Sequence, residues 1–261
     1  MIVVHDSAQL TPDQGAPTVH VVPDVAAAAG PWVMRAVSQV IERTGRCRLA
    51  LAGGSTPGPT YRWLRDHLPH HLYGQLWVTL SDERALRYDA LQPEQWADLP
   101  SDSNLRLVME HWLAHVPMDP KRILPMTLGG PPEGECVRFG REFLRHCNGE
   151  IDVAVLGVGA DGHIASLFAD HPALEVDDVC LLVHDSPKPP AQRISLTGKV
   201  LHGASHIVVL AEGEAKATVL AAVYQGDRRL PVGRLLPHRD LHWVIDKGLG
   251  QALFQLLWGV G

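Results

Sequence analysis

The feature that most restricts the fold is an almost unbroken apolar run at residues 151–156, which leads directly into a glycine-rich turn. A strand with one face in solvent alternates apolar and polar residues, whereas a run without alternation is typical of a strand buried on both faces. Strands of that kind lie inside parallel sheets that carry helices on both sides. The run therefore predicts an α/β fold.

Apolar runs and longer amphipathic segments alternate along the rest of the chain. This alternation predicts a mostly parallel sheet with helices on both faces. Further strands are expected at residues 19–22, 48–51, 76–80, 123–124, 179–183, 207–210 and 241–245. Helices are expected at residues 24–43, 60–68, 103–114, 135–147 and 214–224. A shorter helix of about two turns is expected after His163, because Pro172 would end it.

Length and composition favour one large domain. The chain has 261 residues, of which 46% are hydrophobic, and we expect residues 1–261 to form a single domain with a substantial core. No stretch reaches the roughly 18 apolar residues of a membrane span, and the N-terminus lacks the pattern of a secretory signal. The four cysteines form no Cys-x-x-Cys pair and are expected to be reduced thiols. These features predict a cytoplasmic protein.

The charge balance limits the partners that the chain could bind. A net charge of −6 and the lack of a basic tract argue against nucleic acid. An anionic small molecule would need a local cluster of Arg and Lys. We expect no metal site, since the histidines are scattered and Pro69 separates His67 from His71.

Three loops that follow expected strands begin at Gly53, Asp82 and Gly157. In open α/β sheets, ligands bind beyond the carboxyl ends of the strands. All three loops would lie at that edge of the sheet. The sequence therefore predicts one shared pocket, formed by segments that are far apart along the chain.

The first of these loops, Gly53-Gly54-Ser55-Thr56-Pro57, connects a strand to a helix. Glycines allow a ligand to approach the backbone, and the N–H groups and dipole at a helix N-terminus favour phosphate. A Walker loop is excluded, because no Lys-Ser/Thr pair follows at the required spacing. The alternative is an ordinary turn in which Ser55 or Thr56 caps the helix.

The third loop contains a Gly-x-Gly-x-x-Gly pattern at residues 157–162, so a dinucleotide site must be considered. Such a site requires a full crossover helix next, which Pro172 interrupts. The acidic residue that would bind the ribose should end the next strand, whereas the acids here precede it. No nicotinamide or flavin cofactor is therefore expected.

The same turn places Asp161 and His163 on either side of a glycine. An imidazole, with an ordinary pKa of about 6.5, suits proton transfer at neutral pH. A carboxylate two residues away can orient the imidazole or bind substrate hydroxyls. We expect both residues to be catalytic. The alternative is that His163 caps a short helix and Asp161 makes a turn hydrogen bond.

Four basic residues are positioned to meet an anion. Arg84 closes the segment at residues 81–84, where a guanidinium could bind phosphate through a fork of donors. Prolines stiffen the segment that carries Lys188 and Arg193. Lys216 lies in the first turn of an expected helix, where a cation opposes the dipole unless it meets an anion. In each case the alternative is a solvated surface charge.

At these residues the chain resembles the 6-phosphogluconolactonase family, within a broader group that includes glucosamine-6-phosphate deaminases. The matching segments follow the family's order and lie at residues 51–57, 81–84, 101–108, 152–172, 188–197 and 213–217. The continuation Ser166-Leu167-Phe168 is similar to the lactonase branch, and the acid that deaminases carry after their histidine is missing. Ala169-Asp170 stands where lactonases usually have Pro-Gly, which should alter the turn rather than the chemistry.

The resemblance implies a modified Rossmann-like fold, no metal or other cofactor, and a phosphorylated sugar lactone as the small-molecule partner. On this hypothesis His163, assisted by Asp161, activates water for attack on the lactone carbonyl. The phosphate would rest on Gly53, Gly54, Ser55 and Thr56, and the anionic end of the substrate would be surrounded by Arg84, Arg193 and Lys216, any of which could contact the phosphate directly. Two alternatives remain, which are a deaminase or isomerase of amino-sugar phosphates and a non-catalytic sugar-phosphate sensor. A monomer or small homo-oligomer is expected.

Overall fold

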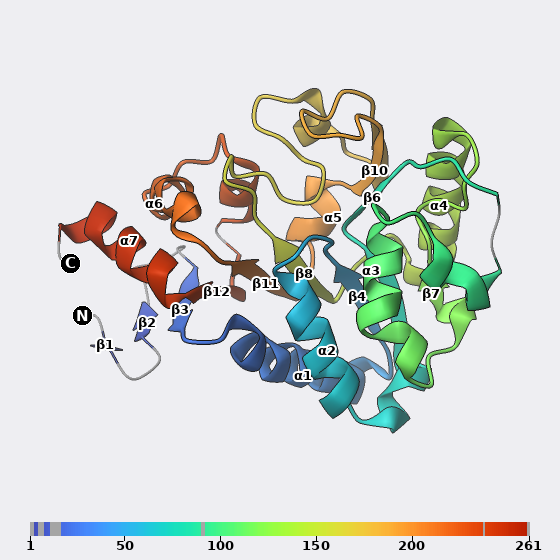
Figure 1. Cartoon of the computed structure of the whole chain (residues 1–261), viewed down its shortest axis with the longest axis horizontal. Helices are drawn as coiled ribbons and strands as arrows, with labels where there is room; N and C mark the ends of the chain where they lie inside the picture. The colour runs from blue at the N-terminus through green and yellow to red at the C-terminus, as the bar shows by residue number, and fades with distance from the viewer. Residues whose placement is uncertain (1–2, 5–7, 11–16, 90–91, 237, 260–261) are drawn as a thin grey trace.

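The computed structural model of the chain describes residues 3–4, 8–10, 17–89, 92–236 and 238–259. Within these residues, nine strands form one sheet through the centre of the molecule (Figure 1). In spatial order they are β1 (Val3–Val4), β2 (Ala8–Leu10), β3 (Thr18–Val22), β12 (Leu241–Asp246), β11 (His206–Ala211), β8 (Val153–Gly157), β4 (Cys47–Leu51), β5 (Leu76–Leu80) and β7 (Ile123–Leu124).

The seven strands from β3 to β7 are parallel, and only β1 and β2 join the edge in antiparallel orientation among the described residues. β8 lies between β11 and β4 and is paired with both. Its side chains from Val153 to Leu156 are fully buried, which explains the unbroken apolar run. The predicted α/β class and mostly parallel sheet are confirmed.

Helices cover both faces of the sheet. Figure 1 shows α1 and α2 on one side, and α5 and α6 on the other. The described α-helices are α1 (Val25–Thr44), α2 (Pro57–His67), α3 (Asn104–His111), α4 (Pro132–Cys147), α5 (Gly198–His202), α6 (Ala217–Tyr224) and α7 (Lys247–Trp258). Short 3-10 turns lie at His70–Gln75, Pro93–Asp98, Leu113–His115, Pro120–Arg122, Pro172–Glu175, Glu214–Lys216 and Pro231–Leu235. None of the helices in the described part of the chain has the length and apolar character to cross a membrane.

Helix α1 shows how local sequence sets these boundaries. The Asp24 carboxylate accepts a hydrogen bond from the N–H of Ala27 at 2.9 Å and so caps the first turn. At the other end, Gly45 adopts a left-handed conformation and donates its N–H to the carbonyl of Ile41 at 2.8 Å. The helix expected at residues 24–43 is thus confirmed to within a residue or two, as usual for helix ends.

A second, antiparallel sheet of three strands lies beside the first. It consists of β6 (Asp82–Arg84), β10 (Arg193–Leu196) and β9 (Cys180–Val183), with β10 in the middle. The strand expected at residues 179–183 therefore exists but does not belong to the parallel sheet. The interpretation of residues 81–84 as a loop was wrong, because Asp82, Glu83 and Arg84 pair with β10.

The expected short helix after His163 was also wrong. Residues Ile164 and Leu167 form an isolated β-bridge, and the N–H of Leu167 donates to the carbonyl of Ile164 at 2.9 Å. Ala165, in the turn between them, has a φ of 50°, which is incompatible with a right-handed helix. Asp170, in the Ala169-Asp170 pair expected to alter the turn, also has a positive φ of 56°.

Candidate active site

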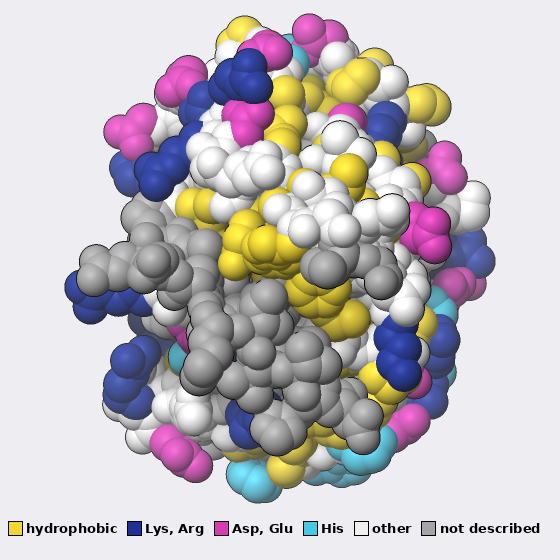
Figure 2. All heavy atoms as spheres, turned by 90° about the vertical axis from the view of Figure 1, so that its left-hand side faces the viewer, with side chains coloured by type: hydrophobic (Ala, Val, Ile, Leu, Met, Phe, Trp, Pro, Cys, Tyr) yellow, Lys and Arg dark blue, Asp and Glu magenta, His cyan; other side chains and the backbone are white. Residues whose placement is uncertain are grey.

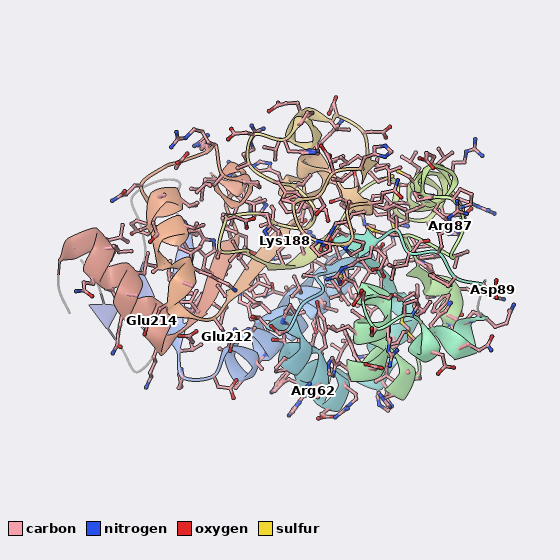
Figure 3. All side chains as sticks on the ribbon, turned by 45° about the horizontal axis from the view of Figure 1, so that its top comes forward. Arg62, Arg87, Asp89, Lys188, Glu212 and Glu214 are labelled. Atoms are coloured by element: carbon pink, nitrogen blue, oxygen red, sulfur yellow. The ribbon has the colours of Figure 1, made fainter. Side chains whose placement is uncertain are left out.

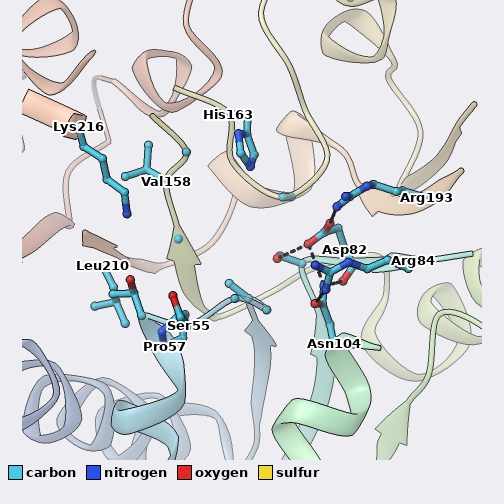
Figure 4. A pocket seen from close by; sticks show the side chains of 18 residues that line it. Ser55, Pro57, Asp82, Arg84, Asn104, Val158, His163, Arg193, Leu210 and Lys216 are labelled. Atoms are coloured by element: carbon cyan, nitrogen blue, oxygen red, sulfur yellow. Dashed lines mark hydrogen bonds and ion pairs between the residues drawn. The ribbon is translucent and has the colours of Figure 1, made fainter. Parts of the chain in front are cut away.

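A pocket of about 220 Å³ lies at the carboxyl ends of β4, β5, β8 and β11 (Figure 4). The three segments predicted to converge there, which begin at Gly53, Asp82 and Gly157, do so, although the second is strand β6 rather than a loop. The lining residues are Ala52, Gly53, Gly54, Ser55, Thr56, Pro57, Ser81, Asp82, Arg84, Asn104, Gly157, Val158, Gly159, His163, Ala165, Arg193, Leu210 and Lys216.

One wall of the pocket is the loop at residues 53–56, between β4 and α2. Within the described chain, the backbone N–H groups of these four residues donate no hydrogen bond to protein atoms. Gly53 packs so closely on Asn104 that a Cβ at position 53 would overlap the Asn104 amide. The loop therefore presents unused donors at the start of a helix, where the dipole adds positive potential.

Arg84 and Asn104 form the neighbouring wall. The Asn104 Nδ2 donates to the Asp82 carbonyl at 2.8 Å, and its Oδ1 accepts a hydrogen bond from Arg84 Nη1. The Nε of Arg84 is buried and has no hydrogen-bond partner among the described residues. Because a buried donor without a partner is costly, this N–H is well suited to a ligand acceptor.

The guanidinium of Arg193, on β10, is only 8% exposed and is largely engaged by protein groups. Its Nη2 donates to the carbonyls of Lys188 and Pro189 at 3.2 and 3.1 Å, and its Nε donates to that of Pro190 at 3.3 Å. Its Nη1 lies 3.5 Å from Asp82 Oδ2. Burial lowers the pKa of Arg193, although the Asp82 carboxylate opposes that shift.

Asp82 connects the second sheet to the segment that follows the active-site turn. Its Oδ2 accepts a hydrogen bond from the buried hydroxyl of Ser166 at 2.6 Å. The N–H of Ser166 in turn donates to Ser195 Oγ, on β10, at 3.3 Å. The sharp turn at Ala165 places Ser166 so that it can make both contacts.

His163 enters the pocket from the turn that follows β8, as Figure 4 shows. Its Nδ1 lies 2.5 Å from Asp161 Oδ1, so Nε2 is the ring nitrogen that Asp161 does not engage. One ring face packs on Phe168, with 5.0 Å between ring centroids. A Cβ on Gly159 would overlap both His163 and Asp161, so only glycine allows this pair to form.

Burial lowers the pKa of the His163 imidazole, and the hydrogen bond to Asp161 opposes that shift. Burial of Asp161 acts to raise its pKa, but the hydrogen bond with His163 and the nearby Lys188 outweigh it and the pKa is lowered. At neutral pH this favours an ionised Asp161 that accepts the Nδ1 proton of an uncharged His163. The free lone pair then lies on Nε2.

Lys216 closes the pocket opposite Arg84 and Arg193 (Figure 4). It belongs to the 3-10 turn that precedes α6, and within the described residues its Nζ makes no hydrogen bond or ion pair. Burial lowers its pKa, while the carboxylates of Glu212 and Asp246 counteract this effect. It is a partly desolvated cation that lines the pocket.

The structure thus brings together the residues that the sequence singled out. The pocket is lined by the predicted residues Gly53, Gly54, Ser55, Thr56, Arg84, Arg193, Lys216 and His163. Asp161 does not line it but contacts His163. Sequence reasoning missed Asn104 and Ser166 as site residues, and it placed Asp82 at the pocket without assigning it a role. Asn104 follows a helix-capping serine, and that pattern alone predicts a helix start rather than a ligand-facing amide.

A parallel α/β sheet whose strand ends surround a cationic pocket with a histidine–carboxylate pair is typical of proteins that bind or convert small anionic molecules. Within that class, the chain belongs to the family described as glucosamine-6-phosphate isomerases/6-phosphogluconolactonase, whose sequence model matches residues 22–243. This confirms the family that the motifs predicted.

Named relatives agree with this assignment. The chain is 33% identical to 6-phosphogluconolactonase of Homo sapiens over 161 residues, which cover 59% of this chain and 62% of the human protein. It is 30% identical to 6-phosphogluconolactonase of Rattus norvegicus over 233 residues, which cover 84% of this chain and 85% of the rat protein. The crystal structure of 6-phosphogluconolactonase from Leishmania guyanensis is similar with a TM-score of 0.75 and 27% identity, covering 90% of this chain and 98% of that one.

Proposed function

We propose that this protein is a 6-phosphogluconolactonase, which hydrolyses 6-phospho-D-glucono-1,5-lactone to 6-phosphogluconate. The observation that carries the proposal is the placement of His163. Its imidazole faces the pocket with Nδ1 bonded to Asp161, opposite unused N–H donors and a cluster of cations. The names of the human and rat relatives support the same activity.

In this proposal the phosphate of the lactone rests on the N–H groups of residues 53–56. Arg84 and Lys216 add positive charge from two sides of the pocket, and the inward edge of Arg193 adds more. These cations offset the acidic field of a chain with a net charge of −6. Anchoring the charged end of the substrate positions the lactone carbonyl for attack.

The chemistry then needs a single base. Nε2 of His163 takes a proton from water while the water oxygen attacks the lactone carbonyl carbon. The tetrahedral oxyanion that forms is stabilised by positively polarised donors in the pocket. When the bond from that carbon to the ring oxygen breaks, the imidazolium returns its proton to the ring oxygen. The product is an open-chain acid, and Asp161 keeps the imidazole in the required tautomer throughout.

The test is a coupled assay with freshly made 6-phosphogluconolactone, corrected for spontaneous opening, on wild type and His163→Asn. We expect the substitution to lower kcat by at least about 100-fold, as is usual for loss of a general base. The matched control is His171→Asn, because His171 also pairs with an aspartate, Asp185, at 2.8 Å but does not line the pocket. The control should retain wild-type turnover.

Three results would contradict this proposal. Near-full activity of His163→Asn would remove that residue from the mechanism. Release of ammonia from glucosamine-6-phosphate would indicate the deaminase alternative. Binding of 6-phosphogluconate without any rate above spontaneous opening would indicate a sensor. The proposal involves no nucleic acid or cofactor, and it places the protein in the cytoplasm as a monomer or small homo-oligomer.

A further inference from the structure

Lys188 reaches the outer edge of the His163–Asp161 pair. Its Nζ lies 3.2 Å from His163 Nδ1 and 3.6 Å from Asp161 Oδ1. The same Nδ1 lies 2.5 Å from Asp161 Oδ1. An anion and a cation therefore meet at one ring nitrogen.

The backbone of Lys188 is held firmly although its side chain is 48% exposed. Its carbonyl accepts hydrogen bonds from Ser186 Oγ at 2.9 Å and from Arg193 Nη2 at 3.2 Å. Arg193 also binds the carbonyls of Pro189 and Pro190. Figure 3 shows Lys188 near the middle of the molecule. A fixed loop directs this side chain toward His163, so the contact is not that of a freely moving surface lysine.

Charged groups face His163 from several elements. Burial disfavours a positive imidazolium most strongly. Asp161, on its own turn, and Asp82, on β6, favour the positive form, whereas Lys188 adds to the effect of burial. Arg84, Arg193 and Lys216 line the same pocket. Asp161 alone would make the ring more basic, as an adjacent carboxylate does. Lys188 is the cation that contacts the nitrogen to which Asp161 is bonded.

We propose that Lys188 is a positioning residue of the active site. Its ammonium offsets the charge of Asp161, which helps to keep His163 uncharged at neutral pH. Asp161 can then fix the tautomer of His163 without making the ring positive. The proposal rests on the hydrolytic function proposed above. An uncharged imidazole has a lone pair on Nε2 with which to accept a proton from water. The same ammonium makes the resulting imidazolium a stronger acid, which assists proton return to the ring oxygen.

The direct test is an NMR titration of His163 in the free protein. Its imidazole signals can be assigned by their loss in His163→Asn. We expect Lys188→Met to raise the pKa of His163 by about one unit, because a cation within about 4 Å is removed from a partly screened site. Lys188→Arg keeps the charge and should restore the wild-type pKa to within a few tenths of a unit.

The kinetic test is the pH dependence of kcat/KM. In Lys188→Met the acid limb of the profile should move upward with the pKa, so that activity near pH 6 falls several-fold while activity near pH 8 changes less than about twofold. The matched control is Lys199→Met, because Lys199 is 64% exposed, pairs with Asp177 at 2.8 Å and does not line the pocket. Its profile should match that of the wild type.

An unchanged pKa of His163 in Lys188→Met would overturn the proposal. So would an equal loss of activity at every pH, which would assign Lys188 a role other than offsetting charge. Absence of lactonase turnover in the wild type would contradict the proposed function instead. The NMR titration would still decide whether Lys188 controls the charge of His163, since it needs no substrate.

Discussion

The three cations of the pocket differ in how many of their donors remain for a ligand. Nη2 and Nε of Arg193 donate hydrogen bonds to loop carbonyls, and its Nη1 faces Asp82. Arg84 gives one nitrogen to Asn104 and keeps a buried Nε without a partner in the described structure. The Lys216 Nζ has no bonded partner within the described residues. Replacement of Lys216 should therefore weaken phosphate binding with the least disturbance of other contacts.

We predict that Lys216→Met raises the KM for the phosphorylated lactone by about 10- to 100-fold, the usual value of a charge-assisted hydrogen bond. The KM for the corresponding lactone without phosphate should change less than about twofold, because that substrate has no anion for Lys216 to meet. Both constants are measured in the same coupled assay. Equal effects on the two substrates would exclude a phosphate role for Lys216.

Among the individual residues, the sequence predicted those whose side chains have distinctive chemistry and missed those whose roles come from contacts with distant segments. His163 and the glycine loop could be found because strand ends place them at one edge of the sheet. The sequence could not predict the roles of Asp82, Asn104 and Ser166, because these roles depend on contacts between segments that are far apart along the chain. Nothing local indicates that a hydroxyl at position 166 will meet a carboxylate at position 82.

Among the secondary-structure elements, β6 and α3 are joined by one buried carboxylate. Glu83 accepts hydrogen bonds from the N–H groups of Arg84, Asn104 and Leu105 and from Ser103 Oγ, all at 2.8 to 2.9 Å. It thus satisfies the free donors at the start of α3. Burial raises the pKa of Glu83 even though these four hydrogen bonds oppose the shift. The contact fixes Asn104 against the pocket.

We predict that Glu83→Gln destabilises the protein by about 2 to 4 kcal/mol, because an amide N–H₂ would replace an acceptor and face donors of α3 in a buried site. Lactonase activity should fall as well, since Asn104 and Arg84 lose their support. Urea denaturation measures the stability change. The matched control, Glu110→Gln, removes an exposed ion pair with Arg106 on the same helix and should cost less than about 0.5 kcal/mol. A similar cost for both variants would refute the anchoring role.

Elements with clear hydrophobic patterns were predictable, and those made by tertiary contacts were not. β5 and β7 have the predicted bounds, and β8 differs by a residue or two. β6 escaped prediction because Asp82-Glu83-Arg84 has no apolar alternation, and its pairing with β10 determines its conformation. α7, at the C-terminus, was not predicted either. The turn after His163 was mistaken for a helix because a positive φ at an alanine has no sequence signature.

Across the whole molecule, a series of hydrogen-bonded polar side chains connects β3, β12 and β11 near the edge of the sheet opposite the pocket. His20, on β3, contacts His242 Nδ1 at 2.8 Å, and His242 Nε2 contacts Asp240 Oδ1 at 2.7 Å. The second oxygen of Asp240 accepts a hydrogen bond from His206, on β11. The contacts form a continuous series if His20 donates to His242, and His242 and His206 each donate to Asp240. Protonation of His20 would add a charge beside His242 and Arg35, on α1.

We predict a loss of stability on acidification that depends on this chain. Burial, and then His242 and Arg35, lower the pKa of His20 to about 4, against about 6.5 when unfolded. Between these values the unfolded chain binds more protons, so this contribution is fully present above pH 6.5 and is lost as pH falls toward 4. From pH 7 to 5 the loss should be about 1 kcal/mol after allowance for solvent screening.

The measurement is the free energy of unfolding as a function of pH. His20→Gln can still donate to His242 but cannot titrate, so its pH dependence should be flatter than that of the wild type in this window. The control is His115→Gln, since His115 is an exposed residue whose ring contacts a backbone carbonyl. Identical slopes for His20→Gln and wild type would show that the His20 pKa is not depressed in the folded state.

One face of the molecule contrasts with the pocket in the charge of its side chains. On the face that includes the side of α7, hydrophobic side chains run across the middle and charged side chains of both signs are interspersed around them (Figure 2). Leu256 and Trp258, on α7, are among the exposed large hydrophobic residues. Cations gather instead in the pocket, where Arg84, Arg193 and Lys216 meet. The local clustering that an acidic protein needs to bind an anion is therefore present.

The pairing of β4 with β8 has a consequence for the length of molecule that the pocket can accept. Leu51 is opposite Val155, so the hydrogen-bond ladder fixes how far the loop after β4 stands from the turn that carries His163. A shift by one residue would move one of them by about 3.3 Å along the strand and reverse its side chains. Under the proposed function, the span from phosphorus to carbonyl carbon is matched to that fixed separation. A lactone whose phosphate is attached one carbon nearer to the carbonyl would reach one end of the pocket but not both.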